Sequence, residues 1–486
     1  MVIAKTRSVL LSVAALLVGS LAVPLTVVAE DAEPIRVDSV HQLFVDDHVV
    51  ADMNLVRRAV HQAEKYPGNP VVTGDKPWES GRAYLYGTVL KDQGIFRMWY
   101  FSGYGGMELM LYATSEDGIH WEKPKLGIVE IDGSTANNVC MVSEAGNMET
   151  YGPLVDPHDP DPQRRYKTLL WEVRSNNRRG VWTATSPDGI HWTKSDKPAA
   201  TEVGDTVGML HGTPPGAYIG FVKIGTKWGR SRALIESQDF RTWSPPKLFM
   251  TTDEEDDQPC QLYNNTGFRY ECMYLGWLET FLAHRDLYKL KLDIELIHSR
   301  DGRGWHRMPG RELVIPCGPD GSWDRLNNAP GGGPPIRVGD NMYIYYSGRT
   351  YYHNPQPFPR EDPRLSAGPD IGTTNIGLAT LRVDGFVSLN ATPVEGTVTT
   401  KPLLLDGKSL HINAVSDWGA IRVEVLDAET REPIAGYELN DCQVMRADSI
   451  DQVVQWTTTD DLPSESKPCR FRFYLKNAQL YSFWVD

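Results

Sequence analysis

Five carboxylic acids occupy similar places in this sequence, each at or shortly before a strand-like run. They are Glu79, Glu149, Asp205, Asp257 and Asp324. Carboxylic acids that share one site push their pKa values apart, so that one stays protonated while another is ionised. Such a pair can donate a proton at one atom and activate water or attack carbon at another. If the fold brings these residues together, the chemistry open to them is general acid–base catalysis.

A recurring turn predicts how the chain positions these acids. Serine, aspartate and tryptophan keep the same offsets in residues 115–121, 186–192, 237–243 and 299–305, and a degenerate copy ends at Phe386. A short apolar run precedes each copy. Each copy is therefore predicted to be a strand that enters a tight turn, in which the aspartate accepts backbone N–H groups. Repetition of one turn favours radially arranged, four-stranded blades over a large two-sheet sandwich, the alternative fold.

The sequence as a whole predicts an all-β protein, with a five-bladed β-propeller over residues 40–392 and a small C-terminal β-sandwich over residues 396–486. The 43 glycines, 33 prolines and many aromatic residues favour turn-rich β structure. The C-terminal region alternates apolar and charged residues and lacks the recurring turn. Residues 37–60 are expected to supply an outer strand that closes the propeller.

The N-terminus has the features of an export signal. A basic start precedes the apolar residues 8–28, and small residues precede Glu30, so cleavage after Ala29 is predicted; an uncleaved anchor is the alternative. No stable membrane span is expected after cleavage, and the protein is predicted to be periplasmic or extracellular. The net charge of −14 argues against nucleic acid as a partner.

The cysteine pattern and the acidic segments give little reason to expect a metal. Six widely spaced cysteines lack the paired spacing of a zinc site, and a disulfide between Cys442 and Cys469 is left open. The acidic run 253–257 could attract structural calcium but is more typical of a solvated loop. Gly331–Gly333 has no following helix and is not a phosphate loop. No cofactor is predicted to be required.

Several motifs resemble those of five-bladed propeller glycoside hydrolases, the group that spans families 32, 43 and 68. They are the recurring turns, Asn69-Pro-Val71, Trp78-Glu79, Gly87-Thr-Val-Leu90 and the closing Gly377-Leu-Ala-Thr-Leu-Arg382. The chain is most similar to exported bacterial proteins with a family 32-type N-terminal domain. The family 32 nucleophile signature, Trp-Met-Asn-Asp-Pro-Asn-Gly, is absent, so fructan specificity is not implied.

The resemblance implies a central funnel in which the ends of the innermost strands deliver the five carboxylates to a carbohydrate substrate. Members of this group use two aspartates and one glutamate. Glu79 or Glu149 is therefore expected to be the acid, and Asp257 or Asp205 the base or nucleophile. Asp324 is expected to orient the substrate or tune a pKa.

Four further residues are expected to bind the substrate. Arg82 can pair with a carboxylate or bind an acidic or sulfated sugar. Trp323 can stack on a sugar ring. His211 and His353 stand at loop positions from which an imidazole can reach a hydroxyl group.

These expectations together predict an exported glycoside hydrolase that cleaves a poly- or oligosaccharide by paired-carboxylate catalysis. One alternative is a carbohydrate-binding propeller without catalysis, because a fold does not by itself imply an activity. A second is a glycoside phosphorylase, which would need arginine, lysine or histidine side chains clustered for phosphate.

Overall fold

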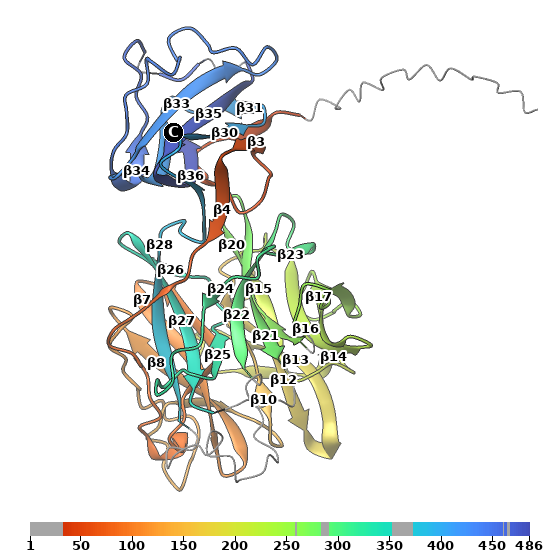
Figure 1. Cartoon of the computed structure of the whole chain (residues 1–486). Coiled ribbons are helices and arrows are strands. Elements are labelled where there is room, and N and C mark those ends of the chain that lie inside the picture. Colours follow the sequence, from red (N-terminus) through yellow and green to blue (C-terminus); the bar gives the residue numbers. More distant parts are fainter. Residues whose placement is uncertain (1–32, 258–259, 283–290, 352–372, 460, 464–466) are drawn as a thin grey trace, which may run out of the picture.

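The computed structural model describes residues 33–257, 260–282, 291–351, 373–459, 461–463 and 467–486, and these ranges are nearly all β-structure (Figure 1). Their helices are three 3-10 turns, η1 (Pro77–Glu79), η2 (Pro162–Arg164) and η3 (Ser175–Asn177). None of the described helices is long and apolar enough to span a membrane. The predicted export signal, residues 1–29, and His353 lie outside the described ranges.

Most strands between residues 84 and 382 form a four-stranded, a five-stranded and a fifteen-stranded sheet. The short parallel pairings β15–β20 and β22–β25 divide the fifteen-stranded sheet into three antiparallel groups, so the chain can be described as five consecutive antiparallel groups. The first contains β6 (Tyr84–Asp92), β7 (Ile95–Tyr104), β8 (Met107–Ser115) and β9 (Val139–Val142), and the second β10 (Met148–Glu149), β11 (Leu154–Val155), β12 (Tyr166–Arg174), β13 (Arg178–Ser186) and β14 (Thr193–Ala200). The third contains β15 (Val207–His211), β16 (Tyr218–Thr226), β17 (Gly229–Ser237) and β18 (Lys247–Met250). The fourth contains β19 (Cys260–Asn265), β20 (Gly267–Tyr270), β21 (Met273–Leu282), β22 (Leu292–Ser299), β23 (Trp305–Arg307) and β24 (Leu313–Ile315). The fifth contains β25 (Asn327–Pro330), β26 (Ile336–Val338), β27 (Asn341–Arg349) and β28 (Thr374–Arg382).

Each group packs on the next through its own apolar core. Separate cores join the first group to the second, the second to the third, the third to the fourth and the fourth to the fifth. Another core joins the fifth group to the first, where Tyr345 of β27 packs with Phe96 and Met98 of β7. The apolar packing therefore runs through the five groups and returns to its start.

The recurring turns have the geometry that the sequence predicts. In the first copy, the Asp117 carboxylate accepts the backbone N–H groups of Ile119 and His120, each at 2.8 Å, and Ser115 Oγ accepts the N–H of Gly118. The other three copies repeat these bonds. The turns also join neighbouring groups, because the Gly118 carbonyl accepts the hydroxyl of Tyr345 at 2.7 Å.

The C-terminal region forms two six-stranded sheets that share one apolar core. One sheet contains β30 (Gly396–Thr400), β31 (Leu403–Leu405), β33 (Ala420–Asp427) and β35 (Cys469–Lys476), and the other β29 (Val387–Ala391), β32 (Leu410–Val415), β34 (Asp448–Val453) and β36 (Ala478–Val485). Cys442 and Cys469 are both buried here as free thiols, so the disulfide left open by the sequence is not formed.

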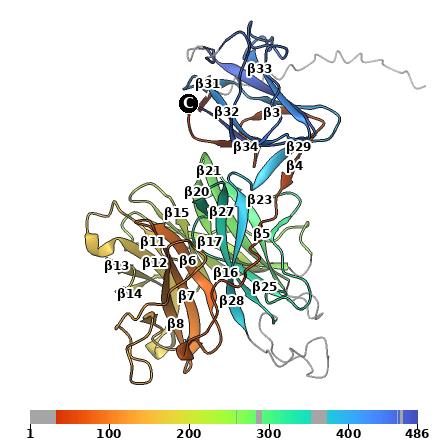
Figure 2. The same cartoon turned by 90° about the vertical axis from the view of Figure 1, so that its left-hand side faces the viewer.

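The N-terminal strands complete these two sheets. β1 (Ile35–Val37) and β3 (Val50–Asn54) pair with β31 and β30, whereas β2 (Gln42–Leu43) and β4 (Val56–Val60) pair with β36 and β29. Figure 1 shows β3 and β4 beside the blue C-terminal strands, and Figure 2 shows the same arrangement from the side. The prediction that residues 37–60 close the propeller is therefore wrong. Val37, Phe44 and Val50 are instead buried in the C-terminal core, and the short strand β5 (Glu64–Lys65) pairs with β28.

A buried aspartate joins the two parts of the molecule. Asp384, in the turn after β28, accepts hydrogen bonds from Tyr270 OH at 2.8 Å and Ser482 Oγ at 2.5 Å, and its Oδ2 lies 2.7 Å from Nδ1 of His41. Tyr270 belongs to β20 and Ser482 to β36, so one carboxylate connects the fourth strand group to a C-terminal sheet. Burial lowers the pKa of His41, but the hydrogen bond and charge of Asp384 outweigh burial and raise it above 6.5.

The contact between His41 and Asp384 predicts a pH-dependent stability. The raised pKa of His41 gives stability that is complete below pH 6.5 and is lost as the pH rises through the higher folded value. Burial raises the pKa of Asp384, but its bond to His41 lowers it below 3.8, so its contribution is lost as the pH falls through that lower value. We expect His41→Gln to lower the free energy of unfolding by about 2 kcal/mol between pH 4 and 6.5. The loss should shrink at higher pH.

Urea unfolding at a series of pH values measures this difference. The matched control is His306→Gln, because His306 is exposed. A difference between wild type and His41→Gln that does not change between pH 5 and 9 would contradict the proposed linkage.

Candidate functional site

The first strands of the five groups approach one another closely, and glycines make this approach possible. Gly332, just after β25, donates its N–H to the carbonyl of Gly87 on β6 at 2.7 Å. A Cβ atom at Gly332 would lie 1.8 Å from the carbonyl oxygen of Tyr151, and one at Gly208 would lie 2.4 Å from that of Asn265. Any larger residue would therefore push the strands apart. Gly331–Gly333 thus serves close backbone packing.

Charged and aromatic side chains from all five groups gather beside this contact. We call this set the central cluster: Tyr84, Tyr86, Glu149, Tyr151, Asp205, Lys223, Arg232, Tyr263, Glu279 and Arg349. The charges are close enough to shift one another's pKa values. Perturbed titratable groups gathered in one place are a mark of functional sites.

Glu149, at the end of β10, is favoured in its protonated form. Burial raises its pKa well above 4.5, and the negative charge of Asp205 raises it further. Lys223 and Arg349 act in the opposite direction but more weakly in sum. Its Oε2 atom is buried and has no hydrogen-bond partner among the residues that the structure describes. These are the properties of a carboxylic acid that can donate a proton.

Asp205 stands just before β15 and forms an ion pair with Lys223 of β16. The Asp205 side chain is 40% exposed, whereas that of Lys223 is 7% exposed and lies over the ring of Tyr263, with Nζ 4.2 Å from the ring centroid. Burial lowers the pKa of Lys223, while the charges of Asp205 and Glu149 raise it. The cation supports the ionised form of Asp205. Glu149 and Asp205 therefore form an acid–carboxylate pair with opposite preferences.

Glu279, on β21, is fully buried. Burial raises its pKa to about 8, although Arg349 and Lys223 act to lower it. Glu279 is thus mainly protonated at pH 7. Its side chain has no exposed surface with which to touch a substrate.

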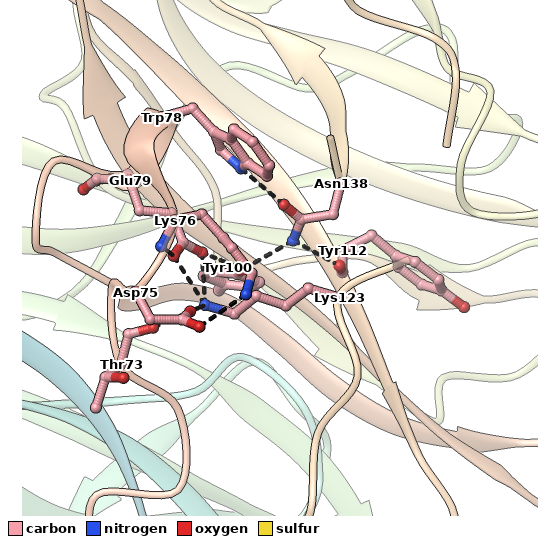
Figure 3. Close-up of polar contacts among 10 residues, drawn as sticks. Thr73, Asp75, Lys76, Trp78, Glu79, Tyr100, Tyr112, Lys123 and Asn138 are labelled. Carbon is pink, nitrogen blue, oxygen red and sulfur yellow. Dashed lines mark hydrogen bonds and ion pairs between the residues drawn. The ribbon is translucent and has the colours of Figure 1, made fainter. Parts of the chain in front are cut away.

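The structure brings together two of the predicted acids, Glu149 and Asp205, and places Glu79 elsewhere. Glu79 is fully buried at the end of η1, where both of its oxygens lie 2.8 Å from Lys123 Nζ (Figure 3). It also accepts the hydroxyl of Tyr100 at 2.5 Å and the backbone N–H of Lys76 at 2.8 Å. Lys123 in turn contacts Asp75. Glu79 therefore fastens the loop before β6 to the first strand group.

Asp324 and Trp323 fasten the fifth group. The Asp324 carboxylate is 2.5 Å from Lys65 Nζ of β5 and accepts the hydroxyl of Tyr346 at 2.9 Å. Trp323 stacks on Tyr346 and fills the space above the glycines at positions 348 and 377. Asp324 therefore connects β5 to β27, and Trp323 packs on β27. Neither residue belongs to the central cluster.

The remaining predicted residues are spread around the molecule. Asp257 is exposed on the loop between β18 and β19, and its neighbour Asp256 is paired with Arg307. His211 lies at the opposite end of β15 from Asp205, where it lines a cavity of about 230 Å³ and burial lowers its pKa to about 4. Arg82 is partly exposed and close enough to lower the pKa of Glu108.

Sequence reasoning missed Lys223, Glu279 and Arg349. Arg349 ends its strand, whereas Lys223 and Glu279 are charged residues inside strands that are otherwise mostly apolar, as in Trp277-Leu-Glu-Thr-Phe281. This interruption is the signal that could have identified Lys223 and Glu279, because a strand rarely buries a charge without a partner or a function. Within the described ranges, no three His, Cys, Asp or Glu side chains are placed to hold a metal ion.

Comparisons with known proteins give low similarity. No family model matches the chain. Two uncharacterized proteins of Mycobacterium tuberculosis, from strains CDC 1551 and H37Rv, are each 27% identical over 150 residues, which is 29% of this chain and 43% of theirs. The chain thus matches less than half the length of these curated relatives.

Solved structures similar to this chain include glycoside hydrolases. A glycosyl hydrolase from Bacteroides ovatus is 14% identical, covers 67% of this chain and 94% of its own, and has a TM-score of 0.44. A thermostable family-43 glycoside hydrolase is 11% identical, covers 67% and 95%, and has a TM-score of 0.43. The function proposed below rests on the central cluster itself.

The contacts of Glu79 predict a structural effect for its substitution. Glu79→Gln should lower the free energy of unfolding by about 3 kcal/mol, because it removes the fully buried one of the two carboxylates that pair with Lys123. Chemical denaturation measures this loss, and the exposed Glu116→Gln is the matched control. A Glu79→Gln protein of unchanged stability would contradict this role.

The electrostatics of the central cluster predict a coupled titration. Asp205→Asn removes the negative charge that raises the pKa of Glu149, so the pKa of Glu149 should fall. Carbon-13 NMR of the glutamate carboxyl groups measures this shift. The control variant Asp257→Asn should leave the pKa of Glu149 unchanged. A pKa of Glu149 that is the same in wild type and Asp205→Asn would show that the two groups do not interact.

Proposed function

We propose that the protein is a glycoside hydrolase in which Glu149 is the general acid and Asp205 the general base or nucleophile. The observation that carries this proposal is the neighbouring pair itself: one carboxyl group held protonated by burial and charge repulsion, and one held next to a lysine. Glycosidic bond cleavage needs such a pair.

In the proposed reaction, Glu149 donates its proton to the glycosidic oxygen as the bond to the anomeric carbon breaks. Asp205 either removes a proton from the water that attacks the anomeric carbon, or attacks that carbon itself to form a glycosyl ester, which water then hydrolyses. Once Glu149 has lost its proton, the positive charges of Lys223 and Arg349 favour its anionic form. The same two cations therefore lower the cost of the proton transfer.

The proposed architecture is a five-bladed β-propeller, with each antiparallel strand group as one blade and the central cluster in its funnel. Apolar cores between consecutive groups, including the core between the fifth and the first, support this arrangement. The two C-terminal sheets would form a β-sandwich. In this proposal residues 1–29 direct export, the partner is a carbohydrate, and the paired carboxylates need no cofactor.

Release of reducing sugar from plant and algal polysaccharides and aryl glycosides tests the proposal. Glu149→Gln and Asp205→Asn should each lower kcat by about a hundredfold or more, because each removes one half of the acid–base pair. Glu79→Gln and Asp257→Asn are matched controls that change the same residue types outside the central cluster. They should keep kcat within about threefold once folded protein is quantified.

Two outcomes would overturn the proposal. Hydrolysis that persists in Glu149→Gln and Asp205→Asn would place the catalytic pair elsewhere. Glycan binding without turnover, equally strong in wild type and both variants, would establish the alternative of a carbohydrate-binding protein.

A further inference from the structure

Arg349 is an unusual cation among the described residues. It lies at the end of β27, partly exposed, and its guanidinium is surrounded by aromatic rings. The distances from its central carbon to the ring centroids of Tyr84, Tyr86 and Tyr351 are 5.7, 5.2 and 5.8 Å. Cation–π contacts of this kind hold the guanidinium in place without consuming its N–H groups. Within the described part of the chain, Arg349 forms no ion pair, and its guanidinium donates no hydrogen bond.

Other buried cations in this protein have bonded partners. Arg307 is 2.7 Å from Asp256 and 2.9 Å from Glu295. Lys167 is 3.0 Å from Asp156, and Lys223 is paired with Asp205. Arg232, which is fully buried, donates hydrogen bonds to Asn265, Thr206 and the carbonyl of Tyr263. A half-buried charge left without such partners is costly, so its retention indicates a ligand.

The carboxyl groups whose pKa values Arg349 lowers form no ion pair with it in the described part of the chain. Arg349 lowers the pKa values of Glu108, Glu149 and Glu279, but burial raises all three, and none forms an ion pair with it. Glu108 instead accepts the hydroxyl of Tyr84. Arg82 is a second guanidinium close enough to lower the pKa of Glu108. The region around Arg349 therefore attracts an anion.

We infer that Arg349 forms an oxyanion subsite beside Glu149 and Asp205, an inference that deepens the proposed function and rests on it. The planar guanidinium can donate two parallel hydrogen bonds to a carboxylate, sulfate or phosphate group. The oxyanion is carried by the sugar itself, as in a uronic or sulfated residue, or it is inorganic phosphate bound next to the sugar. Both sources share the chemistry that Arg349 recognises.

Calorimetric titration tests this subsite without requiring turnover. The probes are glucuronate, galacturonate, glucose 6-sulfate and inorganic phosphate, with glucose and galactose as uncharged counterparts. Wild type should bind at least one oxyanion more tightly than its uncharged counterpart, and added salt should weaken that binding. Arg349→Gln should raise Kd by about tenfold or more, because a charge-assisted hydrogen bond is lost. Arg349→Lys keeps the charge but loses the planar guanidinium, so its Kd should lie between those of wild type and Arg349→Gln.

Arg241→Gln is the matched control, because Arg241 is exposed on the turn after β17 and lies outside the central cluster. Binding of a charged sugar but not of phosphate would assign the oxyanion to the substrate. Binding of phosphate alone would assign the oxyanion to a second reactant and so favour the glycoside phosphorylase alternative over the hydrolase. Thermal unfolding of each variant verifies that the comparison is made between folded proteins.

Three results would overturn the subsite: no binding of any oxyanion probe, equal binding by wild type and Arg349→Gln, or equal affinity for charged and uncharged sugars. Failure of the subsite can be told apart from failure of the hydrolase proposal. Hydrolysis of a neutral glycan that is lost in Glu149→Gln, together with no oxyanion binding, would overturn only the subsite. Arg349-dependent oxyanion binding without any hydrolysis would overturn only the hydrolase.

Discussion

The backbones of segments from different strand groups touch one another, and the rest of this structure depends on that contact. Gly208 and Gly332 permit it, since a methyl group at either position would overlap a carbonyl of the neighbouring strand. Away from this contact, apolar side chains fill the space between consecutive groups. The close central contact and the five cores are thus two parts of one packing arrangement.

The same contact determines the electrostatics of the site. Charged side chains that leave the central strands share a small region with little water, so each one changes the ionisation of its neighbours. Burial and repulsion from Asp205 raise the pKa of Glu149, while Lys223 stays next to Asp205. The difference in environment between Glu149 and Asp205 therefore comes from their positions in the fold, because both side chains are ordinary carboxylic acids.

Several charged side chains outside the central cluster have a structural role. Glu79 binds Lys123, Asp324 binds Lys65, and Asp384 contacts His41, and each of these pairs fastens a segment that comes from a distant part of the chain. The three carboxylates, Glu79, Asp324 and Asp384, are nearly inaccessible to solvent. Buried carboxylates in this fold thus divide into those whose oxygens are bonded to a cation and those, such as Glu149, that retain an unbonded oxygen.

Local patterns in the sequence were sufficient for the features that depend on short-range contacts. The Ser-x-Asp turn forms from hydrogen bonds within four residues, so its spacing alone predicted both the turns and the β-rich fold. Glu149 and Asp205 were found because they stand at the start of first strands.

Glu79 and Asp324 stand in similar places, yet a lysine from a distant segment binds each of them, and no local pattern records that partner. The pairing of residues 35–60 with the C-terminal sheets, and the meeting of Lys223, Glu279 and Arg349, were likewise decided only by the tertiary structure. These contacts join positions far apart in the chain, and their energies depend on burial that exists only after folding.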